Sequence, residues 1–328
     1  MLDSRRILSP SADGEVRIPA LVRHNGILYC FFDQRPRPPH GVGSDFNGEV
    51  MASDLPNPNR LAYLLRGAAG QWSSPRTLQG GPAVSSDACV ASSQGRMTVA
   101  YASVSGPVSY ISSTRHGPRL EPWVASGPSP EELVHRRLDE LYVHWEADAL
   151  FATSGSTITW EGAALVPYVV RQGERAHIRI AHVVGTDVRA CSEPIAHPEL
   201  NLDETSLSIY RGRIVLNARV QGFEGRGAGR RCWATSEDGL HFSPVQVREL
   251  EDPGCNGTQL GPWLLHPRDN QQRRAGVLSN MIDGSTIPLT TGSFGYSDAL
   301  RVDERLLVVF ESDGCLAELY TPPLAEWE

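Results

Sequence analysis

Short apolar runs of strand length recur along the whole chain, and turn-forming residues separate them. Gly, Pro, Asn, Asp or Ser bounds each of the apolar segments 26–32, 96–102, 163–170, 178–184, 213–218 and 305–310. Runs of this length between turn residues are typical of antiparallel strands. With 31 Gly and 24 Pro in 328 residues, the pattern predicts an all-β protein with one large domain or two medium ones.

One segment, 129–140, has a helical pattern. Pro130 can occupy the first turn of a helix, and the acidic Glu131 and Glu132 favour its N-terminus. We therefore expect a short helical insertion between strands.

Charge and residue usage exclude several classes of protein. All 30 basic residues are Arg, so no lysine is present to form a Schiff base or to bind phosphate in a P-loop. The net charge of -8 and the pI near 5.7 argue against a nucleic-acid partner. No apolar run has the length of a signal peptide or a membrane span. We expect a cytoplasmic protein without membrane contact, or a secreted one if its N-terminus is truncated; the oligomeric state stays open.

The cysteines and histidines indicate neither a disulfide framework nor a metal site. The six cysteines are widely scattered without a C-x-x-C pair, and the ten histidines form no H-E-x-x-H or H-x-H pattern. We expect reduced, buried thiols, no bound metal and no cofactor.

Three short segments repeat a strand, a tight turn and an aromatic or apolar residue. They are 235–242, 113–120 and 66–72. They resemble degenerate copies of the Asp-box hairpin of sialidase blades, in which a carboxylate ties the turn. In the best copy, Glu237 stands for the aspartate and Phe242 for the tryptophan. Six blades would take about 55 residues each, which suits four-stranded blades.

A series of motifs in a fixed order carries a stronger resemblance. Arg17-Ile-Pro precedes an apolar strand, Asp33-Gln-Arg35 follows it, and the next loop contains Gly43-Ser-Asp45-Phe-Asn-Gly48. The series is similar to the opening of bacterial and animal sialidases, and 54–59 resembles the actinobacterial branch. The resemblance implies that Arg17 binds a substrate carboxylate, that Asp45 is the acid/base, and that Arg35 supports Asp45 or a substrate oxygen.

The later motifs continue the series. Segments 151–155 and 162–167 resemble the family's middle blades, Glu204 precedes a Leu-Asn-Ala-Arg219 segment, and Phe294-Gly-Tyr296-Ser-Asp298 resembles the family's A-Y-S-D-L motif. By resemblance, Glu204 and Arg219 lie on adjacent strands and face one pocket. Tyr296 is then the nucleophile and Glu204 its base. Without the ordered series, Arg17 would be a surface arginine, Asp45 a turn residue and Tyr296 a packed aromatic.

The resemblance implies one six-bladed β-propeller of the sialidase type over residues 1–328. Its expected reaction is the retaining hydrolysis of α-ketosides of sialic acid or a related nonulosonic acid, so the partner is a small acidic sugar or a sialoside. A neutral tyrosine suits this substrate, because a carboxylate nucleophile would meet the like charge on the sugar.

The chain departs from the family pattern at the third arginine that normally contacts the substrate carboxylate. Residues 282–292, which follow the strand-like segment 277–281, contain no arginine; Arg273 and Arg274 precede that segment, and Arg301 follows Tyr296. The departure leaves two alternatives open. One is an altered reaction (a lyase, transferase or biosynthetic tailoring enzyme) on another carboxylate-bearing substrate in an intracellular pathway. The other is a non-catalytic, glycan-binding propeller.

Overall fold

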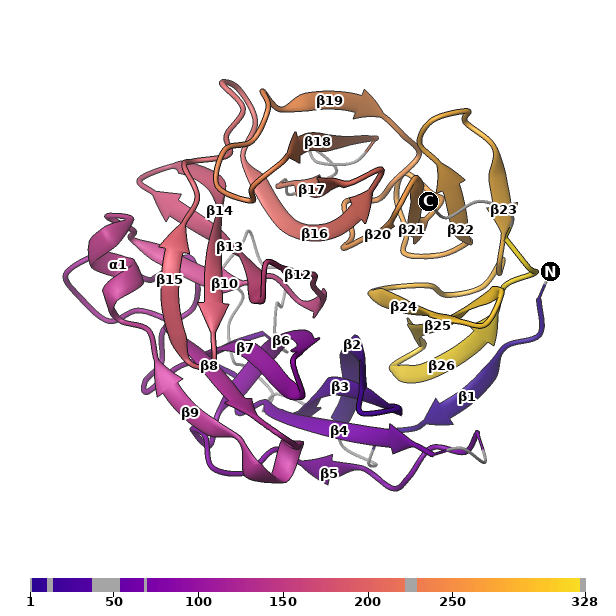
Figure 1. Cartoon of the computed structure of the whole chain (residues 1–328), viewed down its shortest axis with the longest axis horizontal. Coiled ribbons are helices and arrows are strands. Elements are labelled where there is room, and N and C mark those ends of the chain that lie inside the picture. Colours follow the sequence, from indigo (N-terminus) through magenta and orange to yellow (C-terminus); the bar gives the residue numbers. More distant parts are fainter. Residues whose placement is uncertain (1, 11–13, 37–53, 68–69, 222–228, 325–328) are drawn as a thin grey trace.

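The described residues form six sheets around a central axis (Figure 1), which confirms the predicted propeller. The computed structural model describes residues 2–10, 14–36, 54–67, 70–221 and 229–324.

Each sheet is one blade and is built mainly from strands that follow one another in the chain. Blades 1 and 2 comprise β2 (Gly14–His24), β3 (Ile27–Pro36), β4 (Arg60–Arg66) and β5 (Arg76–Thr77), then β6 (Ser85–Ser93), β7 (Arg96–Ser103), β8 (Glu121–Gly127) and β9 (Val134–Arg137). Blade 3 comprises β10 (Ala149–Ala152), β12 (Thr159–Trp160), β13 (Ala163–Gln172), β14 (Arg175–Val184) and β15 (Asp187–Cys191). A further strand, β11 (Gly155–Ser156), pairs in parallel with the inner edge of β6.

The second half of the chain supplies the other three blades. Blade 4 comprises β16 (Leu202–Tyr210), β17 (Arg213–Val220), β18 (Arg230–Ser236) and β19 (Gln246–Glu249). Blade 5 comprises β20 (Thr258–Leu260), β21 (Trp263–Pro267), β22 (Gly276–Asn280) and β23 (Thr286–Pro288). Blade 6 comprises β24 (Ser297–Val302), β25 (Arg305–Ser312), β26 (Cys315–Tyr320) and the N-terminal β1 (Arg5–Leu8).

Two-residue turns with positive φ at both positions set the register of several hairpins. They are Asn25-Gly26, Gln94-Gly95, Arg211-Gly212 and Asp313-Gly314. Such turns match the right-handed twist of the strands they join. Apolar side chains then pack between neighbouring blades, as where Leu165 and Ile178 of blade 3 meet Leu216 of blade 4.

The predicted helix at 129–140 is wrong over most of its length. A 3₁₀ turn (η1, Pro130–Glu132) holds the acidic residues, and the next residues form β9, which pairs with β8. The short α-helix α1 (Glu140–His144) comes later. Pairing with the open edge of β8 satisfies backbone groups along the whole of β9, so the tertiary context overrides the local helical preference.

Two of the three predicted hairpins connect the third and fourth strands of a blade. Arg66 bridges Trp72 in blade 1, and Ser236 bridges Phe242 in blade 4. The carboxylate that ties the second turn is Asp238, which accepts from the amides of Leu240 and His241.

The predicted role of Glu237 is therefore wrong. Its side chain instead pairs with Arg213 on the surface. The segment 113–120 lies in the turns that precede β8, between the second and third strands of blade 2, and makes no third-to-fourth hairpin.

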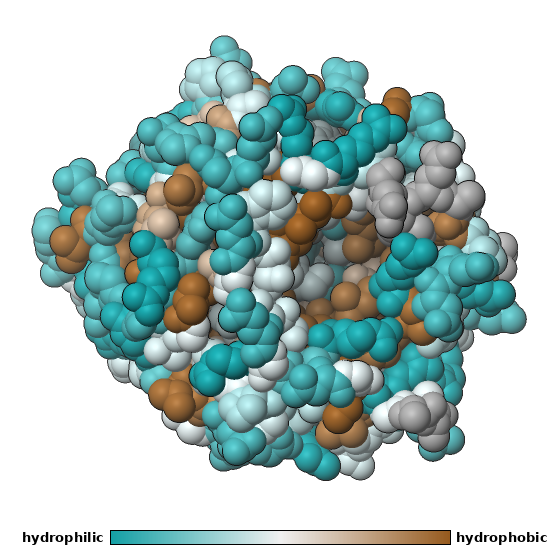
Figure 2. All heavy atoms as spheres, viewed as in Figure 1, coloured by the Kyte–Doolittle hydropathy of each residue, from teal (hydrophilic) through white to brown (hydrophobic). Residues whose placement is uncertain are grey.

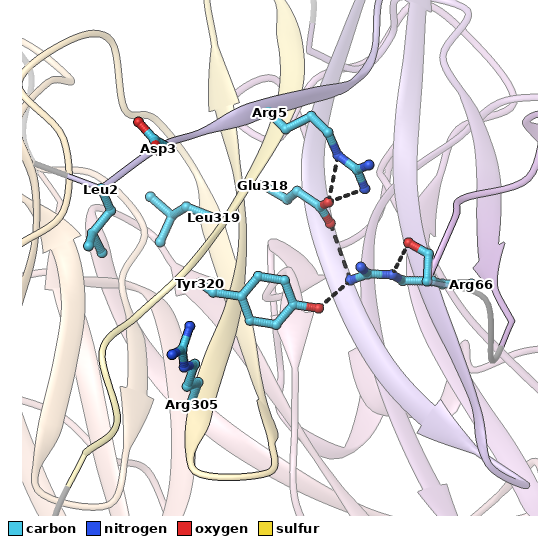
Figure 3. A pocket seen from close by; sticks show the side chains of 9 residues that line it. Leu2, Asp3, Arg5, Arg66, Arg305, Glu318, Leu319 and Tyr320 are labelled. Carbon is cyan, nitrogen blue, oxygen red and sulfur yellow. Dashed lines mark hydrogen bonds and ion pairs between the residues drawn. The ribbon is translucent and has the colours of Figure 1, made fainter.

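The N-terminal strand closes the ring by pairing with β26. Glu318 of β26 bonds Arg5 of β1, and its other oxygen accepts from Arg66 at 3.4 Å and from Trp72 Nε1 at 2.8 Å. Figure 3 shows Glu318 and Tyr320 facing Arg66 at this junction. These residues line a cavity of about 540 Å³. One carboxylate thus joins the first strand of the chain to blades 1 and 6.

Hydrophilic residues cover most of the face seen in Figure 2, which is hollowed near the propeller centre. No helix among the described residues is long and apolar enough to cross a bilayer.

Candidate functional site

Bulges in the first strands of three blades present the polar side chains of the site. The pairing register shifts between Arg17 and Ala20 in β2, between Ser86 and Cys89 in β6, and within 202–205 in β16. Ile18 has φ 58° and Asp87 has φ 64°. A β-branched residue at positive φ is a genuine outlier, and bulges of this kind re-aim neighbouring side chains.

Tyr296 and Glu204 meet directly, although they are 92 positions apart. The phenol, just before β24, donates a hydrogen bond to Glu204 Oε1 from β16. Ile18 and Cys255 pack against Tyr296 as an apolar wall. Burial, followed by the charge of Glu204, raises the pKa of Tyr296 well above its ordinary value. The phenol is therefore neutral at physiological pH, and its proton already faces a carboxylate.

Arg219 reaches Glu204 from the adjacent strand, as the sequence predicted. Its Nη1 lies 2.8 Å from Glu204 Oε2 and 3.9 Å from Asp203 Oδ2. Burial opposes the charge of Arg219, but the two carboxylates hold its pKa well above the ordinary value. Arg219 is thus a fixed cation beside the tyrosine–glutamate pair.

Arg17 approaches the same phenol from blade 1. Its guanidinium carbon lies 5.3 Å from the centroid of the Tyr296 ring, within the range of a cation–π contact. Glu311 of β25 accepts from Arg17 Nε at 3.1 Å and from the Ile18 amide at 2.8 Å. Glu311 therefore fixes both the side chain and the strained backbone of this segment.

A third arginine, Arg273, completes the group. Its guanidinium carbon lies 5.0 Å from the Tyr296 centroid. The other two candidates face elsewhere: Arg274 pairs with Asp269, and Arg301 donates to the backbone of Asp303. Arg17, Arg219 and Arg273, here called the arginine cluster, thus surround one buried phenol.

Arg35 lies beside the cluster within a group of acidic side chains. It is buried and bonds Asp33 at 2.7 Å and Asp54 at 2.5 Å, while Asp87 lies 3.7 Å away. Burial, and then the neighbouring charge of Asp33, raises the pKa of Asp87 to about 8. Asp87 therefore keeps its proton to a higher pH than an ordinary aspartate does.

Of the six predicted site residues, the structure brings Arg17, Glu204, Arg219 and Tyr296 into direct contact and places Arg35 alongside. Asp45 lies outside the described residues. Asp54 is the nearest described carboxylate to follow it in the chain, and Arg17 Nη1 lies 3.9 Å from its Oδ1. The side chain of Asp54 is 44% exposed, so solvent and a ligand can reach it.

The sequence interpretation missed Asp87 and Glu311 and left Arg273 undecided. Asp87 carries no motif that separates it from a turn aspartate. Glu311 is the next-to-last residue of the apolar strand β25, where a buried acidic residue is uncommon. Within the described part of the chain, no cluster of three or more His, Cys, Asp or Glu is arranged to hold a metal.

Comparison with known proteins supports the fold. No family model and no curated protein matches the sequence. Among solved structures, Trypanosoma rangeli sialidase is 15% identical with a TM-score of 0.66, over 98% of this chain and 59% of its own. The NanB sialidase from Streptococcus pneumoniae is 12% identical with a TM-score of 0.67, over 94% of this chain and 70% of its own.

A viral structure matches over almost its whole length. A subtype N10 neuraminidase-like protein of a little yellow-shouldered bat virus is 12% identical with a TM-score of 0.62, over 97% of this chain and 99% of its own. The chain thus has the sialidase fold, and it spans about three fifths of the length of the trypanosomal sialidases it matches. The resemblance to the actinobacterial branch stays a prediction.

Proposed function

We propose that the chain is a retaining exo-glycosidase that removes sialic acid or a related nonulosonic acid from an α-ketoside. The observation that carries this proposal is the hydrogen bond from Tyr296 to Glu204 inside the arginine cluster. A binding site for an acidic glycan needs the cations alone, whereas a phenol aimed at a carboxylate base is built for proton removal.

In the first step, Tyr296 Oη attacks the ketosidic carbon while Glu204 accepts its proton. The bond to the leaving oxygen breaks, and an aspartic acid protonates that oxygen. In the second step, water attacks the same carbon, the aspartate takes a proton from the water, and Tyr296 leaves and recovers its proton from Glu204. Two displacements at one carbon retain its configuration.

The arginine cluster supports the choice of substrate. Three guanidinium groups around one phenol match a carboxylate on the carbon that the phenol attacks, since each can donate charge-assisted hydrogen bonds to it. An altered reaction was motivated by a missing third arginine, and Arg273 provides that cation. The binding-only alternative gives no role to the hydrogen bond from Tyr296 to Glu204.

Two aspartates are candidates for the acid/base. The family resemblance assigns Asp45, whereas the structure places Asp54 beside Arg17 and Arg35. In either case, replacing the acid with asparagine should slow the cleavage of natural sialosides by about 10²- to 10⁴-fold. Cleavage of an aryl sialoside should slow far less, because its leaving group needs no proton.

Turnover of sialyllactose and of a 4-methylumbelliferyl sialoside by Asp45→Asn and Asp54→Asn tests this assignment. Proton NMR of the first-formed sugar reports the configuration. The variant that lacks the acid should cleave sialyllactose much more slowly but the aryl sialoside only slightly more slowly. The other variant should not show this difference between the two substrates. Inverted product, or no such dependence in either variant, would contradict the proposed mechanism.

The role of Arg273 can be separated from that of its neighbour. Arg273→Met should raise KM about 10- to 100-fold, because one charged hydrogen bond contributes about 1.5–3 kcal/mol. Arg274→Met is the matched control, since Arg274 pairs with Asp269 on the surface. Steady-state kinetics of both variants give the comparison; equal KM values would remove Arg273 from the carboxylate site.

A further inference from the structure

Asp298 lies two residues after Tyr296 and is completely buried near the propeller axis. Its carboxylate accepts four hydrogen bonds. Oδ2 accepts from the amides of Leu21 and Ser156, each at 2.7 Å, and Oδ1 accepts from Ser156 Oγ and the Ala299 amide, each at 2.8 Å. Every donor except Ala299 comes from another part of the fold.

The donors identify what Asp298 holds together. Leu21 belongs to β2 of blade 1, Ser156 to the added strand β11, and Asp298 itself to β24 of blade 6. β2 and β24 are the innermost strands of their blades, so one edge of each faces the axis without a neighbouring strand of its own sheet. Buried amides on such an edge need an acceptor, and Asp298 provides it.

The same two strands carry site residues. Leu21 is four positions after Arg17, and Asp298 is two positions after Tyr296. Glu311 already connects these segments at one point, because it accepts from the Ile18 amide and from the Tyr296 amide. Asp298 adds a second connection farther along both segments. Two connections, at Glu311 and at Asp298, fix the relative orientation of the two strands, whereas a single connection would let one strand rotate against the other.

Two other junctions between blades are connected by neutral hydroxyl groups. Thr153 Oγ1 donates to the Thr205 carbonyl between blades 3 and 4, and Thr258 Oγ1 donates to the Ser297 carbonyl between blades 5 and 6. At the junction of blades 6 and 1, the connection is instead the carboxylate of Asp298, which accepts several hydrogen bonds. Hydrogen bonds to charged groups are the stronger kind.

We propose that Asp298 is a positioning residue that, through Leu21 and Ser156, holds the nucleophile strand in register with the strand of Arg17. This inference rests on the proposed function. The rate of the proposed reaction should depend on Asp298 because a displacement of about 1 Å between reacting groups lowers the rate about 100-fold.

Ser156→Ala and Ser92→Ala form a matched pair for the test. Ser156 Oγ donates to Asp298, whereas Ser92 Oγ bonds Nδ1 of His24, the last residue of β2, at 2.8 Å, also between strands of different blades. Both substitutions remove one hydroxyl from an inter-blade hydrogen bond. Asp298→Asn is the stronger variant, because its amide NH₂ would face donors.

Steady-state kinetics, thermal unfolding and hydrogen exchange of the Leu21 and Ser156 amides are measured for all three variants. We expect kcat to fall at least tenfold in Asp298→Asn and about two- to fivefold in Ser156→Ala, and to stay within twofold in Ser92→Ala. Exchange at Leu21 should accelerate in Asp298→Asn and Ser156→Ala only.

If Ser156→Ala and Ser92→Ala lose activity equally, or if kcat is unchanged in Asp298→Asn, Asp298 has no positioning role. If the wild-type protein does not turn over sialosides, the proposed function is wrong instead. In that case the exchange rates still decide whether Asp298 connects the strands: unchanged protection of Leu21 in Asp298→Asn would overturn the connection itself.

Discussion

Tyr296→Phe should lower kcat for a sialoside on the order of 10³-fold or more, because in the proposed mechanism it removes the oxygen that attacks the ketosidic carbon. The ring keeps its packing against Ile18 and Cys255 and its contacts with Arg17 and Arg273, so folding and binding of the acidic sugar should change little. Turnover and the affinity for a dehydrated sialic acid analogue measure the two effects separately.

Tyr168→Phe is the matched control for this substitution. Tyr168 is fully buried in blade 3, and its hydroxyl has no hydrogen-bond partner among the described residues. Losing that hydroxyl should leave both stability and turnover near the wild-type values. If Tyr296→Phe retained more than about a tenth of the activity, the phenol would not be the nucleophile.

Glu318→Ala should lower the free energy of unfolding by about 3 kcal/mol, because it leaves a mostly buried guanidinium without its carboxylate. Arg66 is 10% exposed, and Trp72 Nε1 would also lose its acceptor. The same change frees Arg5 and weakens the attachment of the N-terminal strand that closes the ring. Urea denaturation followed by circular dichroism gives the value.

Glu237→Ala provides the comparison, since the pair that Glu237 makes with Arg213 is exposed on both sides. Exposed pairs contribute at most about 1 kcal/mol. A similar small loss in Glu318→Ala would show that strand pairing alone closes the propeller.

The sequence predicts an all-β protein because its signals are local and repeated, and the resemblance to sialidases adds the six-bladed propeller. Strand-length apolar runs and two-residue turns such as Asn25-Gly26 specify hairpins without reference to distant parts of the chain. The error at 129–140 has the opposite origin. Residues 134–137 form β9 because they pair with the edge of β8, and the sequence of 129–140 alone does not indicate that pairing.

The site residues that belong to recognisable, ordered motifs could be predicted from the sequence. The choice between chemically identical residues could not, because it depends on the three-dimensional structure. Arg273 and Arg274 are adjacent and chemically identical, yet one lies over the Tyr296 ring and the other pairs with Asp269. Asp87 gains its raised pKa from burial and from Asp33, 54 positions away. Neither distinction can be derived from composition or spacing.

Covalent trapping tests the role of Tyr296 most directly. The protein is incubated with 2,3-difluorosialic acid, digested at arginine, and examined by mass spectrometry. The account predicts one sialyl adduct on peptide 275–301 and its disappearance in Tyr296→Phe. An enzyme that turns over sialosides but carries the adduct on another residue, or none at all under conditions that inactivate it, would contradict the account.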